Sequence, residues 1–109
     1  MREMAKPFER FESDLNWQQV SLLLDTVLYF EDAPKLLLIP DLQQTRVPVP
    51  LVADTLRAIA DTLSESEPHA AKRFAFEWEE GGEADVLIVR LPNGETVRQP
   101  TDYQAFSPV

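Results

Sequence analysis

The residues most able to do chemistry lie together in one short stretch, FAFEWEEGGEAD, at positions 74–85. Carboxylate oxygens are the ligands that Ca²⁺ and Mg²⁺ prefer, and this stretch places several acids around a Gly-Gly pair. The spacing lacks the EF-hand register, in which acids alternate along a loop that a glutamate closes. Acids at a hairpin tip also keep an apolar sheet soluble. We therefore expect no metal and no cofactor, with cation binding by these carboxylates kept as an alternative. The acids in question are Glu77, Glu79, Glu80, Glu83 and Asp85.

Other catalytic arrangements are poorly supported. Glu77 and Glu79 fall on one face of a predicted strand, as a glycosidase pair would, but nothing nearby indicates a sugar-binding cleft. His69 is the single histidine and there is no cysteine, so a monomer cannot build a common zinc site. The chain has no Gly-x-Ser-x-Gly elbow, and its three glycines all fall in predicted turns. We expect that the protein is not an enzyme.

The negative charge is concentrated in one part of the chain. The formal net charge is −9, and residues 61–85 carry eight acids against Lys72 and Arg73. Such a field repels nucleic acid and anionic membranes and attracts basic partners. The expected partner is therefore another protein with a basic surface, without direct nucleic acid binding or membrane binding. Its contact residues are predicted to be the five acids of the 74–85 stretch together with Trp78, because tryptophan is enriched at binding hot spots.

The first half of the chain predicts a helix, a pair of strands and a second helix. A helix is expected over 14–31 with Ser13 or Asp14 as its N-cap, although residues 26–30 also have strand chemistry. Residues 35–39 are apolar on both faces, which is typical of a central buried strand. Residues 45–49 are expected to pair with them at a sheet edge, since Pro48 has no backbone donor. Pro50 then fits the first turn of a helix over 50–63.

The last third of the chain predicts a three-stranded meander. Phe74, Phe76 and Trp78 alternate with polar residues, Val86–Val89 is apolar, and residues 95–99 follow a Pro-Asn-Gly turn. The order is thus helix, one or two strands, helix, three strands. It predicts an α+β two-layer sandwich, with two helices packed on a mostly antiparallel sheet.

The length of 109 residues suits one domain. We expect a flexible N-terminal arm over 1–12, a single α+β domain over 13–103 and a C-terminal tail over 104–109. No apolar run is long enough to span a bilayer, and the N-terminal residues lack the apolar core of a secretory signal. A cytoplasmic location is the default expectation.

The apolar elements exceed what two helices can cover, which favours a homodimer or a partner surface. We therefore expect a small acidic protein-binding domain of adaptor, chaperone or inhibitor type, which engages its partner through the acidic hairpin and apolar surface. The alternative is a phage- or plasmid-type inhibitor that mimics nucleic acid and acts on a DNA- or RNA-handling enzyme. No motif in the sequence identifies a family.

Overall fold

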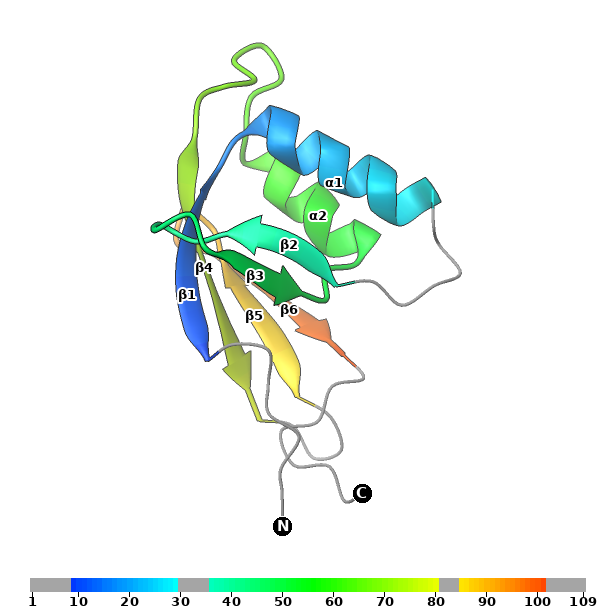
Figure 1. The fold of residues 1–109 in the computed structure, drawn as a ribbon, viewed down its shortest axis with the longest axis vertical. Helices are drawn as coiled ribbons and strands as arrows, with labels where there is room; N and C mark the ends of the chain where they lie inside the picture. The colour runs from blue at the N-terminus through cyan, green and yellow to red at the C-terminus, as the bar shows by residue number, and fades with distance from the viewer. Residues whose placement is uncertain (1–8, 30–35, 81–84, 102–109) are drawn as a thin grey trace.

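The computed structural model describes residues 9–29, 36–80 and 85–101, and these form an α+β fold of two helices and six strands (Figure 1). The chain runs through these elements in the order β1 Arg10–Leu15, α1 Trp17–Tyr29, β2 Leu37–Pro40, β3 Arg46–Val49, α2 Ala53–Asp61, β4 Lys72–Glu79, β5 Val86–Arg90 and β6 Thr96–Pro100.

Four of the strands form one antiparallel sheet in the order β1-β4-β5-β6. The predicted meander is confirmed as β4, β5 and β6. Val86–Val89, apolar on both faces, belongs to β5, which lies between two other strands as such a sequence should. Strands β2 and β3 form a separate antiparallel hairpin.

The strand β1 was not predicted. Residues 10–12 were expected in a flexible arm, and Ser13 or Asp14 was expected to cap the first helix; these residues instead pair with β4 along the edge of the sheet. The sequence alternates as a strand does, with Phe11, Ser13 and Leu15 turned inward. Phe11 stacks on Phe76 of β4, with the ring centroids 4.9 Å apart. Pairing with β4, which is distant in the sequence, explains why this segment of charged and aromatic residues forms a strand.

Helix α1 starts at a capping box that begins with Asn16. The side chain of Asn16 accepts a hydrogen bond from the backbone N–H of Gln19 (2.8 Å), and the Gln19 side chain accepts one from the N–H of Asn16 (2.9 Å). This reciprocal pair satisfies two of the donors that every helix start leaves unpaired. The helix continues to Tyr29, so residues 26–29 are helical rather than extended; residues 30 and 31 lie outside the described part of the chain.

Helix α2 begins at Ala53, later than the predicted start at Pro50. Its N-cap residue, Val52, has no side chain that can cap a helix, and the cap comes from a distant strand. The side-chain oxygen of Gln99 in β6 accepts a hydrogen bond from the Val52 N–H (3.1 Å), and its amide nitrogen donates to the Pro50 carbonyl. Buried Gln99 thus fixes the entry to α2 on the sheet.

The prediction that residues 35–39 form a central strand is wrong for the described part of that segment. Strand β2 pairs with β3 and does not join the four-stranded sheet. Leu37 and Ile39 point into the core, while Leu36 and Leu38 are exposed. The apolar run therefore has one buried face and one face toward solvent.

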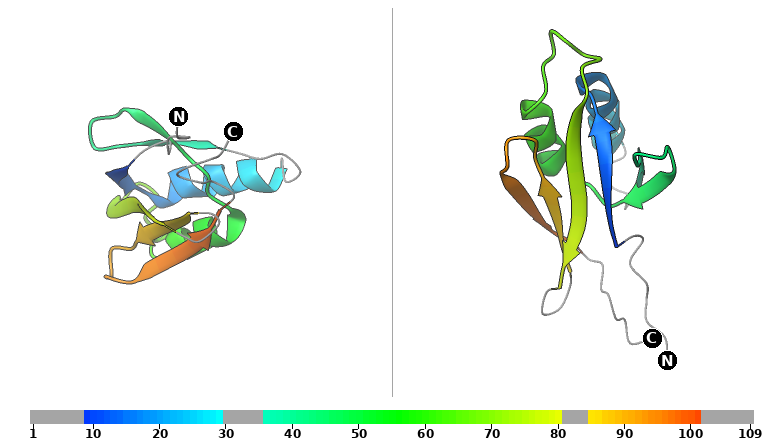
Figure 2. Two further views of the ribbon diagram at one scale, coloured as in Figure 1. Left: turned by 90° about the horizontal axis from the view of Figure 1, so that it is seen from below. Right: turned by 90° about the vertical axis from the view of Figure 1, so that its left-hand side faces the viewer.

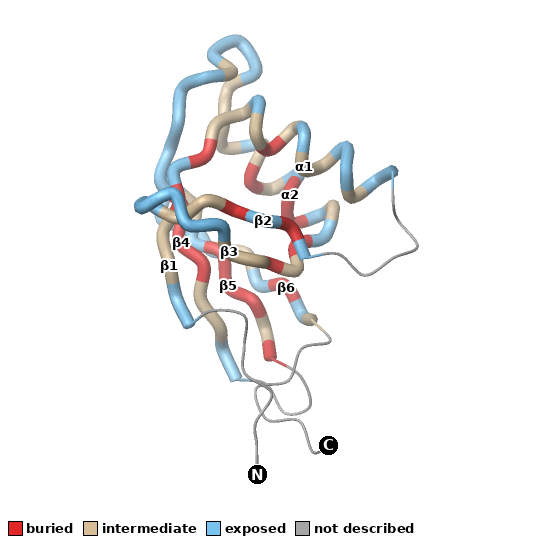
Figure 3. The backbone as a smooth tube through the Cα atoms, viewed as in Figure 1, coloured by how far each residue is buried: buried red, intermediate tan, exposed pale blue. Residues whose placement is uncertain are grey.

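The core lies between the inner face of the four-stranded sheet and the elements that cover it. Figure 2 shows the helices on one face of the sheet, with no described helix or strand over the other face, and Figure 3 shows buried positions along the strands of both sheets and in both helices. Buried side chains come from both sheets and both helices: Leu15, Val20, Leu37, Ile39, Val49, Leu56, Ile59, Phe74, Phe76, Leu87 and Val89. Neither of the described helices has the length and apolar character needed to cross a membrane.

Candidate functional site

The acidic residues predicted to bind a partner do not form one cluster. Glu77 and Glu79 project from β4 on the uncovered face of the sheet, where each is bonded to arginine. Glu80 is exposed just beyond β4, Asp85 is buried, and Glu83 lies outside the described residues. The described acids of the stretch thus differ in their surroundings, because two are ion-paired on the sheet face, one is exposed beyond the strand and one is buried.

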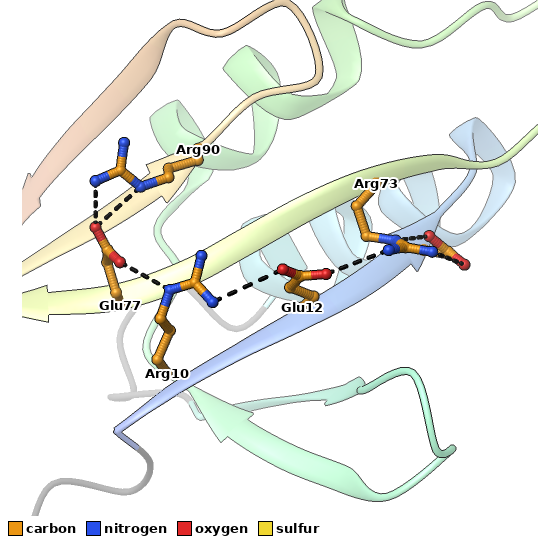
Figure 4. A network of polar contacts seen from close by, with 6 residues as sticks. Arg10, Glu12, Arg73, Glu77 and Arg90 are labelled. Carbon is orange, nitrogen blue, oxygen red and sulfur yellow. Dashed lines mark hydrogen bonds and ion pairs between the residues drawn. The ribbon is translucent and has the colours of Figure 1, made fainter.

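Glu77 is the centre of a chain of ion pairs across three strands (Figure 4). One carboxylate oxygen accepts a hydrogen bond from Nε of Arg10 on β1 (3.0 Å), and the other accepts from Nε and Nη2 of Arg90 on β5 (3.0 and 2.6 Å). Arg10 is the direct cross-strand neighbour of Glu77, while Arg90 is diagonal to it. Opposite charges at such positions stabilise a sheet modestly.

The chain of ion pairs continues along β1. Arg10 Nη1 lies 3.7 Å from Glu12, and Arg73 of β4 donates to both Glu12 (3.2 Å) and Asp14 (2.6 Å). Together with the separate pair between Glu79 and Arg98, this surface contains four carboxylates and four guanidinium groups. These eight side chains carry no net charge, so the uncovered face of the sheet is not an acidic surface.

The arginines shift the titration of the groups they contact. The pKa of Glu77 is lowered from its ordinary value, chiefly because Arg90 donates hydrogen bonds to the ionised carboxylate, with a further contribution from Arg10. The pKa of Arg73 is raised, chiefly by its hydrogen bond to Asp14. Both shifts are those of a structural ion-pair network in which carboxylates are kept charged, and neither prepares a proton donor for catalysis near neutral pH.

The long charged side chains on this face shield Ile88 from solvent. It points outward from β5, yet it is only 7% exposed. Glu77 and Arg98 are its direct cross-strand neighbours. The methylene groups of arginine pack on apolar surface while the guanidinium stays in water. The ion pairs thus shield an outward-facing isoleucine and keep the uncovered sheet face polar.

Trp78 and Asp85 both contribute to the folded interior. Trp78 is half-buried and packs against the hydrophobic core. Asp85 is 4% exposed, and its backbone carbonyl accepts hydrogen bonds from the backbone N–H and the side-chain hydroxyl of Thr101. Within residues 9–29, 36–80 and 85–101, no group of three or more His, Cys, Asp or Glu side chains is placed to hold a metal ion.

The most distinctive surface of the described residues is an apolar patch on α1 that the sequence analysis missed. Leu22 is 62% exposed, Leu28 45% and Tyr29 80%, and with Asp25 and Thr26 they line one shallow hollow. We call these five residues the α1 patch. Leu22 and Tyr29 are seven residues apart, two helical turns, and this spacing was the available signal.

The hairpin of β2 and β3 presents further exposed apolar side chains. Leu38 on β2 is 57% exposed, and Leu36 and Leu42 flank it along the chain. Leu38 is paired with Pro48 across the hairpin, so both lie on the face turned away from the core. The loop between these strands, 41–45, is held by Asp41, whose carboxylate accepts hydrogen bonds from the backbone of Gln43 and Thr45.

Comparisons with protein-family models, with curated proteins and with solved structures found no match for this chain.

Proposed function

We propose that this chain is a non-catalytic protein-binding domain, of adaptor, chaperone or inhibitor type, that contacts its partner through the α1 patch. The observation that supports this most directly is the exposure of Leu22 and Tyr29 around a common hollow. Single exposed apolar residues are ordinary in proteins, but adjacent ones rimmed by polar groups are typical of interaction sites. Helix α1 packs on the core with the side that contains Val20. The side that carries the α1 patch is exposed and can contact a partner.

The energy available at the patch is adequate for a reversible contact. Fully burying one leucine-sized side chain contributes roughly 1.5–3 kcal/mol. Three partly exposed side chains therefore supply several kcal/mol, against which the loss of translational and rotational freedom must be set. Such a balance supports a transient partner interaction better than a permanent one.

The acidic hairpin takes a smaller part in this proposal than the sequence suggested. Glu77 and Glu79 are engaged by arginines of the same chain, which lowers the charge they offer to a partner. This pairing also removes much of the support for a nucleic-acid mimic, which needs rows of carboxylates without neutralising cations. Exposed Glu80 is the described member of the predicted set that is best placed to contribute.

Affinity capture with the tagged full chain tests the proposal. The bait proteins are the wild type, the double variant Leu22→Ser/Tyr29→Ser, and Leu42→Ser as a matched control for an exposed leucine outside the patch. We expect a protein that is enriched by the wild type and by the control and is lost with the double variant. Enrichment that is equal for all three baits, with the double variant folded by circular dichroism, would contradict the proposal.

A further inference from the structure

The α1 patch combines apolar side chains with one exposed carboxylate. Asp25 is the single charged residue in Trp17–Tyr29, and it lies in the hollow between the exposed leucines and Tyr29. Thr26 uses its hydroxyl within the helix, donating a hydrogen bond to the Leu22 carbonyl (2.9 Å). The polar group that the hollow offers to an approaching molecule is therefore the Asp25 carboxylate.

This carboxylate is not offset by another charge of the helix. No basic side chain occurs within Trp17–Tyr29. Among the described residues no cation forms an ion pair with Asp25. Within the part of the chain that the structure describes, the negative charge in the hollow is therefore not neutralised by a cation.

A second copy of the chain is poorly suited to this surface. Two copies that pair symmetrically bring the same residues of each together around the two-fold axis. A symmetric contact through the hollow would place Asp25 near Asp25, and the net charge of −9 on each chain adds to the repulsion. A basic partner that supplies a cation to Asp25 avoids both the contact between two Asp25 carboxylates and the repulsion between two acidic chains.

We infer that the α1 patch binds a basic amphipathic helix of another protein. Apolar side chains of that helix pack on the open surface formed by Leu22 and Tyr29, and a lysine or arginine of the same helix pairs with Asp25. Amphipathic helices bind their partners through the apolar side chains of one face. The inference rests on the proposed function and specifies its partner: a cationic, helix-forming segment rather than an acidic or neutral one.

The probe is a fluorescein-labelled helical peptide with leucine on one face and lysine on the other. Its matched counterpart has glutamate in place of each lysine. Fluorescence anisotropy of each peptide is measured against the full chain, and we expect binding of the lysine peptide only. Leu22→Ser should weaken this binding about tenfold, and Asp25→Asn should weaken it about 2- to 5-fold. Asp25→Lys should weaken binding of the lysine peptide further.

Two control variants separate the patch from general attraction between opposite charges. Glu67→Gln removes one negative charge from the exposed connector before β4, and Leu42→Ser removes an exposed leucine from the hairpin loop. Both should bind the lysine peptide as the wild type does. If Glu67→Gln weakens binding as much as Asp25→Asn, the attraction comes from net charge and the inference is wrong.

Other outcomes distinguish this inference from the proposed function. If protein capture depends on Leu22 and Tyr29 but Asp25→Asn changes neither capture nor peptide binding, the proposed function stands and the basic helix is excluded. If sedimentation velocity shows a wild-type dimer that Leu22→Ser dissociates, a second copy occupies the patch and the inference is overturned. Absence of any lysine-peptide binding also overturns it, while the capture experiment still decides the proposed function.

Discussion

At the scale of single residues, Gln44 is the clearest departure from ordinary backbone geometry. Its φ is +67°, in the left-handed region that residues other than glycine and asparagine rarely adopt. It lies in the loop between β2 and β3, where its N–H donates to the Asp41 carbonyl (2.9 Å). The hairpin loop thus imposes this conformation on a residue that does not favour it.

Gln44→Gly should therefore stabilise the protein by about 0.5–1 kcal/mol, because glycine adopts the left-handed region without a steric cost. Urea denaturation followed by circular dichroism measures the change. The neighbouring Gln43→Gly is the control, since Gln43 has no positive φ and glycine there only adds disorder to the unfolded chain. Equal effects of the two substitutions would show that the positive φ of Gln44 does not lower the free energy of unfolding.

Gln99 illustrates a residue whose importance the sequence does not reveal. A glutamine near the end of a strand is usually exposed, but this one is 5% exposed and bonds to the backbone of Val52 and Pro50. We expect Gln99→Met, which keeps the approximate volume, to lower the free energy of unfolding by about 2–3 kcal/mol, because two backbone groups lose their partners.

Chemical denaturation of Gln99→Met measures this cost, with Gln18→Met on the exposed side of α1 as the control. Hydrogen exchange adds a local test: the amide protons of α2 should exchange faster in Gln99→Met than those of β5, since the substitution releases the start of α2. Unchanged stability would mean that the two hydrogen bonds of the Gln99 side chain contribute no more than the apolar contacts of a methionine.

At the scale of elements, the four-stranded sheet is stabilised differently on its two faces. The inner face packs aromatic and aliphatic side chains, while the outer face uses cross-strand ion pairs centred on Glu77. Exposed ion pairs contribute little individually, but a connected row that also covers Ile88 has a structural use. The network makes the stability of this sheet depend on pH.

The sign of this dependence follows from the lowered pKa of Glu77, whose ordinary value is 4.5. Because the folded-state pKa is below the unfolded one, Glu77 contributes stability above about pH 4.5, and this contribution is lost as the pH falls through the folded-state pKa. Glu77→Gln should cost about 0.5–1 kcal/mol at pH 7. The difference from the wild type should shrink toward zero as the medium becomes more acidic.

Thermal unfolding of the wild type and Glu77→Gln over a pH series from neutral to acid tests this prediction. Glu67→Gln serves as the control, because Glu67 belongs to the exposed connector and forms no ion pair within the described residues. A constant gap between wild type and Glu77→Gln at every pH would assign the effect to packing rather than to charge.

At the scale of the whole molecule, one core joins the two sheets. Ile39 and Val49 of the hairpin belong to the same buried cluster as Phe76 and Leu87 of the four-stranded sheet. A side-chain hydrogen bond from buried Ser13 of β1 to the Pro40 carbonyl of β2 adds a polar link between them. The hairpin is therefore part of the domain core and not an appendage.

The shared core predicts a single cooperative unfolding transition. Trp17 reports on α1 and Trp78 on β4, so the variants Trp17→Phe and Trp78→Phe each leave one local fluorescence probe. In each variant the urea midpoint from fluorescence should equal that from far-ultraviolet circular dichroism. A lower midpoint for the α1 probe than for the circular dichroism of the same variant would indicate that α1 unfolds before the rest of the domain.

The sequence by itself determined the features that depend on local periodicity. The meander of β4, β5 and β6, the pairing of β2 with β3 and the presence of two helices all follow from alternation, turn residues and helical spacing. The α+β class follows from the order of these elements. These patterns require no knowledge of distant contacts, which is why they could be read from the chain alone.

Only the tertiary structure decided which faces are buried and which charges are neutralised. Arg10 and Glu77 are 67 residues apart in sequence, so nothing local shows that the predicted acidic site is bonded to arginine. Strand β1 is ordered by its pairing with β4, and α2 is capped by Gln99 from β6. The α1 patch likewise became visible once packing had assigned Val20 to the core and left Leu22 and Tyr29 outside it. Burial and charge pairing are properties of the assembled layers, whereas periodicity is a property of the chain.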